Sequence, residues 1–157
     1  MGKEIERKYL VKGDRWKNLA QGVLYRQGYI ATVGATVRVR VIGDRGYLTI
    51  KGKSIGTVRS EFEYPIPVED AEEMLNTLCD RPLIEKFRYI IPYGNLLWEV
   101  DEFLGDNAGL IIAEVELENE QQQVTLPDWI DKQVTDSKYF NSNLVKHPYK
   151  LWVVDNG

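Results

Sequence analysis

Charged and apolar residues alternate along most of this 157-residue chain, and the charges recur on one side of each alternating segment. In the first segment Glu4, Glu6 and Lys8 share one side, whereas Ile5 and Tyr9 share the other. Successive side chains of a β-strand point to opposite faces, so this spacing predicts strands with one charged and one apolar face. The fold must therefore accommodate a sheet with one face that is charged throughout.

Seven of the eight strands that we predict carry such a charged row. Short turns containing Gly with Asn or Asp, such as residues 43–46 and 93–95, predict that neighbouring strands are antiparallel. Helical spacing is limited to Asp14–Gln21, Val68–Asp80 and a weaker segment at Ser137–Lys146. The predicted strands are Lys3–Val11, Val23–Val33, Ala35–Gly43, Gly46–Lys53, Arg59–Pro67, Pro82–Tyr93, Asn95–Leu104 and Gly109–Glu118.

The composition indicates an ordered protein, because 43% of the residues are hydrophobic and 11% are aromatic. A formal charge of −4 argues against nucleic acid held by a positive outer surface. One cysteine excludes an internal disulfide, and the charged N-terminus does not resemble a signal peptide. The apolar runs are too short to cross a bilayer. We expect a single cytoplasmic domain over residues 1–157, binding neither nucleic acid nor membrane.

The charged rows have two possible locations. On an outer sheet face they would form exposed ion pairs, which contribute only about 0–1 kcal/mol each and give no reason for so regular a pattern. In a closed barrel of eight strands they would instead line a lumen that can admit one small ligand. We therefore predict an α+β fold, an eight-stranded antiparallel β-barrel with a few peripheral helices packed on its apolar outer face.

A lumen of this kind indicates a particular ligand. Arginine offers paired donors to phosphate oxygens and lysine a point charge, so converging bases suit a compact molecule with several phosphates. Paired carboxylates suit a hard divalent cation, and Mg²⁺ in particular is commonly shared between carboxylates and substrate phosphates. A metal and an oligophosphate together indicate phosphoryl transfer.

The opening Glu4-Ile5-Glu6-Arg7-Lys8 resembles the ExExK motif of the CYTH superfamily, the triphosphate tunnel metalloenzymes. The resemblance continues in order along nearly the whole chain and is strongest to the short bacterial inorganic triphosphatases. It implies that basic side chains bind a triphosphate and that acidic side chains bind Mg²⁺ or Mn²⁺. The implied phosphate-binding residues are Lys8, Arg38, Arg40, Lys51, Arg59, Lys86 and Arg88. The implied metal-site residues are Glu4, Glu6, Glu114 and Glu116, with Asp101, Glu61 and Glu63 as further candidates, the last two alternatively orienting the bases.

The resemblance leaves the activation of water open. Tyr29 with Lys86 matches a pair that is proposed to generate the base in short bacterial members, and a nearby lysinium could lower the phenol pKa. Alternatively, a second metal and a carboxylate orient the water, and Tyr29 is only a wall residue. The segment 138–144 resembles the family's C-terminal helix, which covers one end of the tunnel.

We expect hydrolysis of tripolyphosphate to pyrophosphate and phosphate, in a monomer or homodimer. The family also contains thiamine triphosphatases and class IV adenylate cyclases, for which Trp98 or Tyr25 could stack on the organic group of another triphosphate-bearing small molecule. A non-catalytic polyphosphate-binding module is the third alternative. Binding an anion gains nothing from adjacent carboxylates, so the acid pairs favour an enzyme.

Overall fold

The computed structural model describes residues 3–155. Within them the helices are α1 (Val68–Thr77), α2 (Asn141–Lys146) and α3 (Tyr149–Asp155), with single 3₁₀ turns at Arg15–Asn18, Gly105–Asn107 and Ser137–Tyr139. No helix in this range has both the length and the apolar character needed to cross a membrane. The strands are β1 (Lys3–Val11), β2 (Val23–Ile30), β3 (Thr36–Ile42), β4 (Arg45–Lys51), β5 (Val58–Ile66), β6 (Ile84–Tyr93), β7 (Leu96–Phe103), β8 (Ile111–Glu116) and β9 (Ile130–Val134).

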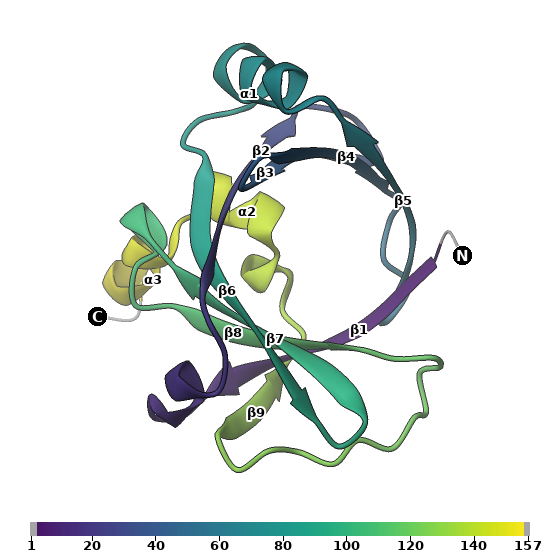
Figure 1. Cartoon of the computed structure of the whole chain (residues 1–157), viewed down its shortest axis with the longest axis vertical. Helices are drawn as coiled ribbons and strands as arrows, with labels where there is room; N and C mark the ends of the chain where they lie inside the picture. Colours follow the sequence, from purple (N-terminus) through teal and green to yellow (C-terminus); the bar gives the residue numbers. More distant parts are fainter. Residues whose placement is uncertain (1–2, 156–157) are drawn as a thin grey trace.

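Strands β1 to β8 form a closed antiparallel barrel, as predicted (Figure 1). Hydrogen-bonded neighbours follow the order β5-β4-β3-β2-β6-β7-β8-β1, and β1 then pairs with β5 to close the ring. The closing contact is short, because only Lys3–Ile5 of β1 pairs with residues 58–60 of β5. On its other edge β1 pairs with β8 over residues 6–10. Closure gives the charged rows a common interior.

The ninth strand was not predicted. β9 pairs with the edge of β1 that β5 leaves free, with Lys8 opposite Val134 and Val11 opposite Ile130. Several predicted strands also run past the observed ends: the segment Val23–Val33 ends at Ile30, and Gly46–Lys53 ends at Lys51, which leaves Lys53 exposed outside β4.

Helices were predicted less well than strands. The segment Asp14–Gln21 forms only the turn Arg15–Asn18, where Trp16 is buried and its Nε1 donates to the Gly13 carbonyl. The predicted helix Val68–Asp80 ends at Thr77. The segment Ser137–Lys146 is divided at Phe140, whose backbone is extended, and α3 follows without having been predicted.

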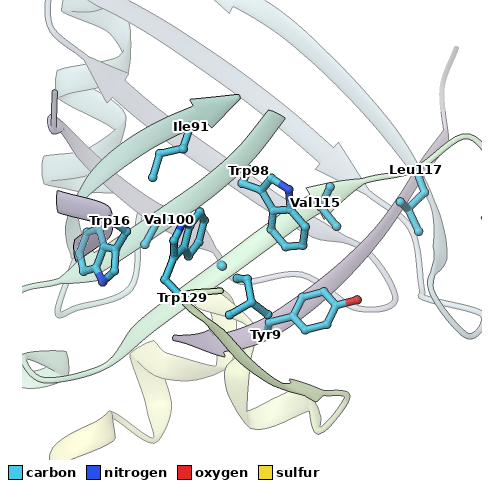
Figure 2. Close-up of a cluster of buried hydrophobic side chains, with 10 residues drawn as sticks. Tyr9, Trp16, Ile91, Trp98, Val100, Val115, Leu117 and Trp129 are labelled. Carbon is cyan, nitrogen blue, oxygen red and sulfur yellow. The ribbon is translucent and has the colours of Figure 1, made fainter. Parts of the chain in front are cut away.

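Hydrophobic core residues lie on both faces of the barrel wall. One cluster packs α2 and α3 against the inward-facing Ile84, Phe103 and Ile112, and the other two lie on the outer face. Figure 2 shows Trp16, Trp98 and Trp129 gathered on the outer face of β1, β7 and β8, with Tyr9 and Trp98 rings 5.5 Å apart. A second layer packs α1 on β3 and β4, where a side chain at Gly46 would collide with Ala71. The helices do not cover the whole apolar face as expected, because Ile50, Phe62 and Tyr64 on β4 and β5 are exposed.

Candidate active site

A cavity of about 220 Å³ lies inside the barrel, and charged side chains dominate its lining. Inward positions of adjacent strands face one lumen, so the alternation seen in the sequence brings the predicted residues together. All of the predicted bases line it, namely Lys8, Arg38, Arg40, Lys51, Arg59, Lys86 and Arg88. The lining acids are Glu4, Glu6, Glu61, Glu63, Glu99, Glu114 and Glu116, which include every predicted metal-site residue except Asp101.

Strand register places the acids of β1 and β8 side by side. Glu6 lies directly opposite Glu116, and Lys8 lies opposite Glu114. The Lys8 Nζ is 2.7 Å from the Glu114 Oε1 and 3.2 Å from the Glu6 Oε1. Glu4, also on β1, instead faces Lys51, whose Nζ lies 3.2 Å from its Oε1. One wall of the cavity therefore concentrates carboxylates, with lysines between them.

The arginines of β3 have donors left over for a ligand. Glu63 accepts from Thr49 Oγ1 at 2.8 Å and lies 3.3 Å and 3.4 Å from the Nη2 atoms of Arg38 and Arg40. This geometry favours orientation of the arginines, one of the two roles predicted for Glu63. The Nε atoms of both arginines are buried and have no hydrogen-bond partner among the described residues. An anion with several oxygens would satisfy them.

Asp101 stands behind the bases of β6 and does not line the cavity. It is fully buried, and its two oxygens accept from Lys86 Nζ at 2.7 Å, Arg88 Nε at 2.7 Å and Arg88 Nη2 at 2.8 Å. Although burial raises the pKa of Asp101, the Arg88 and Lys86 charges outweigh it and the net pKa is lowered. These contacts favour a positioning role for Asp101 over the metal role predicted from the sequence.

The carboxylates of β1 and β8 repel one another. Burial, followed by the Glu114 charge, raises the pKa of Glu6 to about 7, and burial also raises the pKa of Glu4 and of Glu116. Burial acts on Glu114 too, but the Lys8 and Arg88 charges hold its pKa well below the usual range. The charged forms of Glu4, Glu6 and Glu116, unlike that of Glu114, therefore lack a sufficient counter-charge within the protein.

These acids suit Mg²⁺ or Mn²⁺ in their chemistry. Both ions prefer carboxylate oxygens, and the positive charge of a divalent ion would offset the burial and the Glu114 charge that raise the pKa of Glu6. Among residues 3–155, no three His, Cys, Asp or Glu side chains already converge as a metal site. These carboxylates thus fit Mg²⁺ or Mn²⁺, although in this conformation Lys8 pairs with Glu114 and Lys51 pairs with Glu4.

Tyr29 lines the cavity, but its surroundings differ from those expected for a tyrosine and lysine pair. Lys86 Nζ donates to Asp101 and, at 2.8 Å, to Asn141 Oδ1. Tyr29 Oη accepts from Gln27 Nε2 at 2.8 Å. Burial raises the pKa of Tyr29 despite the nearby charge of Arg38, whereas the sequence interpretation invoked a lowered pKa.

The segment before and within α2 closes one end of the cavity, as the resemblance implied. Phe140, Asn141 and Ser142 line the cavity, and α2 lies beside β6 (Figure 1). The Phe140 ring centroid lies 5.8 Å from Lys8 Nζ and 5.3 Å from Arg59 Cζ, distances typical of cation–π contacts. A second cavity of about 350 Å³ shares Glu4, Glu6, Lys8, Arg59 and Phe140 with the first.

Several polar residues of the site were not predicted as site residues from the sequence, among them the cavity-lining Glu99, Thr36 and Ser142 and also Gln27, Thr49 and Asn141. Gln27 and Thr49 are neutral, so they do not contribute to the charged rows that identified the others. Asn141 reaches the site from the far end of the chain and had no periodic signal. Gln27, two residues from Tyr29, and Thr49, two residues from Lys51, lie on the same strand faces as predicted site residues and could have been proposed from spacing.

Comparisons with known proteins identify the family. The model of the CYTH domain matches residues 2–149. The chain belongs to the CYTH domain family. A curated relative of this CYTH protein, the inorganic triphosphatase of Acetivibrio thermocellus, is 58% identical over 152 residues, 96% of this chain and 97% of that protein.

Solved structures agree on the fold of this CYTH protein. The inorganic triphosphatase NE1496 has a TM-score of 0.62 and 32% identity, with 90% of this chain and 93% of that chain covered. The putative adenylyl cyclase HpAC1 from Hippeastrum, whose structure reveals a dominant triphosphatase activity, has a TM-score of 0.58 and 15% identity over 74% of this chain and 80% of that one. At that identity the second likeness supports the fold alone.

The aromatic residues considered for an organic group, Trp98 and Tyr25, do not line the charged cavity. Trp98 is fully buried in the outer core, away from the lumen. The Tyr25 ring lies 5.1 Å from Arg40 Cζ and 4.9 Å from Arg88 Cζ, so the bases already contact it. Within the described residues, Tyr29 and Phe140 are the aromatic side chains that line the charged cavity.

Proposed function

We propose that this CYTH protein is a divalent-metal-dependent inorganic triphosphatase. The observation that carries the proposal is the charged cavity, in which buried arginines with unused donors face a wall of carboxylates. The 58% identity to an inorganic triphosphatase over nearly the full length of both chains supports the same reaction and substrate. In that reaction a water oxygen bonds to a terminal phosphorus, the bond to the bridging oxygen breaks, and pyrophosphate leaves.

The bases bind and orient the substrate. Arg38 and Arg40 on β3 and Arg88 on β6 offer guanidinium donors to the phosphate oxygens, and Lys51, Arg59, Lys8 and Lys86 add charge around them. Most of these side chains are buried, so a bound phosphate chain is shielded from bulk water and its attraction to the bases is strengthened. Glu63 and Asp101 hold the arginines in place before substrate arrives.

The acids of β1 and β8 would hold Mg²⁺ or Mn²⁺, with Glu4, Glu6, Glu114 and Glu116 as the ligands that we propose. When bound, such an ion neutralises charge on the phosphate oxygens and helps to place the attacking water. Lys8 and Lys51 must give up part of their contact with these carboxylates when the ion binds, and phosphate oxygens are available to pair with both lysines instead.

Phosphate release measured on a panel of substrates tests the proposal. Tripolyphosphate, ATP, thiamine triphosphate and pyrophosphate are each supplied with Mg²⁺ or Mn²⁺, and cyclic AMP is assayed alongside. We expect tripolyphosphate to give the highest kcat/KM, with one phosphate and one pyrophosphate formed per molecule. Preference for thiamine triphosphate or formation of cyclic AMP would replace the substrate assignment, and the absence of any product would indicate a binding module.

A further inference from the structure

A chain of hydrogen bonds fixes the direction in which Tyr29 presents its proton. Lys86 Nζ donates to the Asn141 side chain at 2.8 Å. An ammonium group only donates hydrogen bonds, so the amide atom that faces it is the oxygen. Lys86 therefore sets the orientation of the Asn141 amide, which the geometry of the amide alone does not decide.

The same oxygen sets the orientation of Gln27. Gln27 is fully buried, and its side-chain nitrogen lies 3.2 Å from Asn141 Oδ1 and 2.8 Å from Tyr29 Oη. Because Asn141 presents an oxygen, the nearby atom of Gln27 is its NH₂ group, and both hydrogens of that group are used. Tyr29 consequently accepts a hydrogen bond from Gln27.

The proton of the Tyr29 hydroxyl must then point elsewhere. Tyr29 lines the cavity, and among the described residues its hydroxyl donates to no protein acceptor. The charged groups that act on it most strongly are Arg38, Arg40 and Lys8, which are all cationic. Cationic side chains offer no acceptor, so a suitable acceptor is an anionic oxygen brought into the cavity by a ligand.

We propose that the Tyr29 hydroxyl donates a hydrogen bond to a phosphate oxygen of the substrate, and that Gln27 and Asn141 are positioning residues that set its direction. This inference rests on the proposed function for the identity of the substrate. It gives Tyr29 a role opposite to that of a base, because the hydroxyl keeps its proton. Burial, which raises the pKa of Tyr29, acts in the same direction.

The pH dependence of a Tyr29→Phe variant distinguishes a donor from a base. Loss of a hydrogen bond to a charged group lowers kcat/KM by about tenfold to hundredfold. We expect this loss at every pH, with the shape of the wild-type profile retained. A change in the profile's basic limb, or no loss at all, would overturn the donor role. Tyr9→Phe is the matched control, because Tyr9 lies in the outer core, and we expect its kcat/KM to equal that of wild type.

A double-mutant cycle tests the positioning role of Gln27. Gln27→Glu presents an acceptor to Tyr29 and draws the phenolic proton away from the substrate, so we expect a loss in kcat/KM similar to that of Tyr29→Phe. In the Tyr29→Phe background, Gln27→Glu should cause little further loss in kcat/KM. If the effect of Gln27→Glu were purely structural, the losses in kcat/KM of the two substitutions would multiply. Multiplicative losses would overturn the role of Gln27. If Gln27→Glu does not fold, Gln27→Met removes the donor with similar volume and serves in the same cycle.

Calorimetry with inorganic tripolyphosphate separates this inference from the proposed function. A wild-type protein without turnover would refute the triphosphatase proposal, and its affinity for tripolyphosphate would still be measurable. In that case the donor role predicts severalfold weaker binding by Tyr29→Phe than by wild type or Tyr9→Phe. Equal affinities of the three proteins would overturn it.

Discussion

Replacing Asp101 with asparagine tests how the barrel wall holds its two innermost bases. The substitution keeps the volume of the side chain but removes the charge that Lys86 and Arg88 share. Both bases are buried, with side-chain exposures of 1% and 8%, so solvent cannot replace the lost partner. Burial lowers the pKa of Lys86 to about 7 even with Asp101 opposing it, so the variant should shift that pKa lower still.

The expected loss of stability follows from these contacts. Asp101 makes three charge-assisted hydrogen bonds of 2.7–2.8 Å. Breaking a buried pair by removing one partner costs about 3–5 kcal/mol, a large part of the roughly 5–15 kcal/mol that stabilises a domain. With a urea dependence of about 2 kcal/mol per M, the midpoint of unfolding should fall by roughly 1.5–2.5 M.

Urea unfolding followed by tryptophan fluorescence measures this loss directly. The matched control is Asp106→Asn, because Asp106 pairs with Lys150 at the surface, where both side chains are about half exposed. Such a pair contributes about 0–1 kcal/mol, so the control midpoint should barely move. An Asp101→Asn variant that loses less than 1 kcal/mol, or no more than the control, would refute the claim that Asp101 anchors the two bases.

Further predictions concern the two walls of the cavity. Arg40→Ala should raise KM more than it lowers kcat, because we propose that Arg40 binds the substrate; steady-state kinetics with tripolyphosphate would refute this if only kcat changed. Glu6→Ala should abolish turnover at limiting metal, and an unchanged rate would exclude Glu6 as a ligand. The pKa of Glu6 is raised from 4.5 to about 7, so its stabilising contribution is complete below pH 4.5 and is lost as the pH rises through about 7. In metal-free buffer the unfolding free energy of wild type relative to Glu6→Gln should therefore fall over that range, and a rise would contradict the raised pKa of Glu6, which burial and the Glu114 charge produce.

The alternation of charged and apolar residues was sufficient to predict the barrel, together with the bases and most of the acids that line its cavity. Charges on one face of seven strands are tolerable only where they face one another or a ligand, and closure of β1 onto β5 provides that interior. β9 escaped prediction because its centre, Asp131 to Gln133, is polar and exposed, and it pairs with only part of β1. The position of β9 depends on where the pairing between β5 and β1 ends, and no local pattern in the sequence indicates that point.

The roles of the site residues were harder to predict than which residues belong to the site. Glu99 and Asp101 lie on the same face of β7 and look equivalent in the sequence, but register places Asp101 directly opposite Arg88 and behind the cavity. Gln27 and Asn141 carry no charge, and their importance depends on the oxygen and nitrogen orientations that Lys86 imposes. Such roles come from pairing between strands and from the docking of α2, so three-dimensional contacts were needed to find them.

Phosphate release from tripolyphosphate by the purified protein, with and without added Mg²⁺ or Mn²⁺, tests the central claim most directly. The charged cavity predicts equal amounts of phosphate and pyrophosphate, no reaction after removal of the metal with a chelator, and recovery when the metal is restored. Product formation that is unaffected by the chelator, or no product with any metal, would contradict the account.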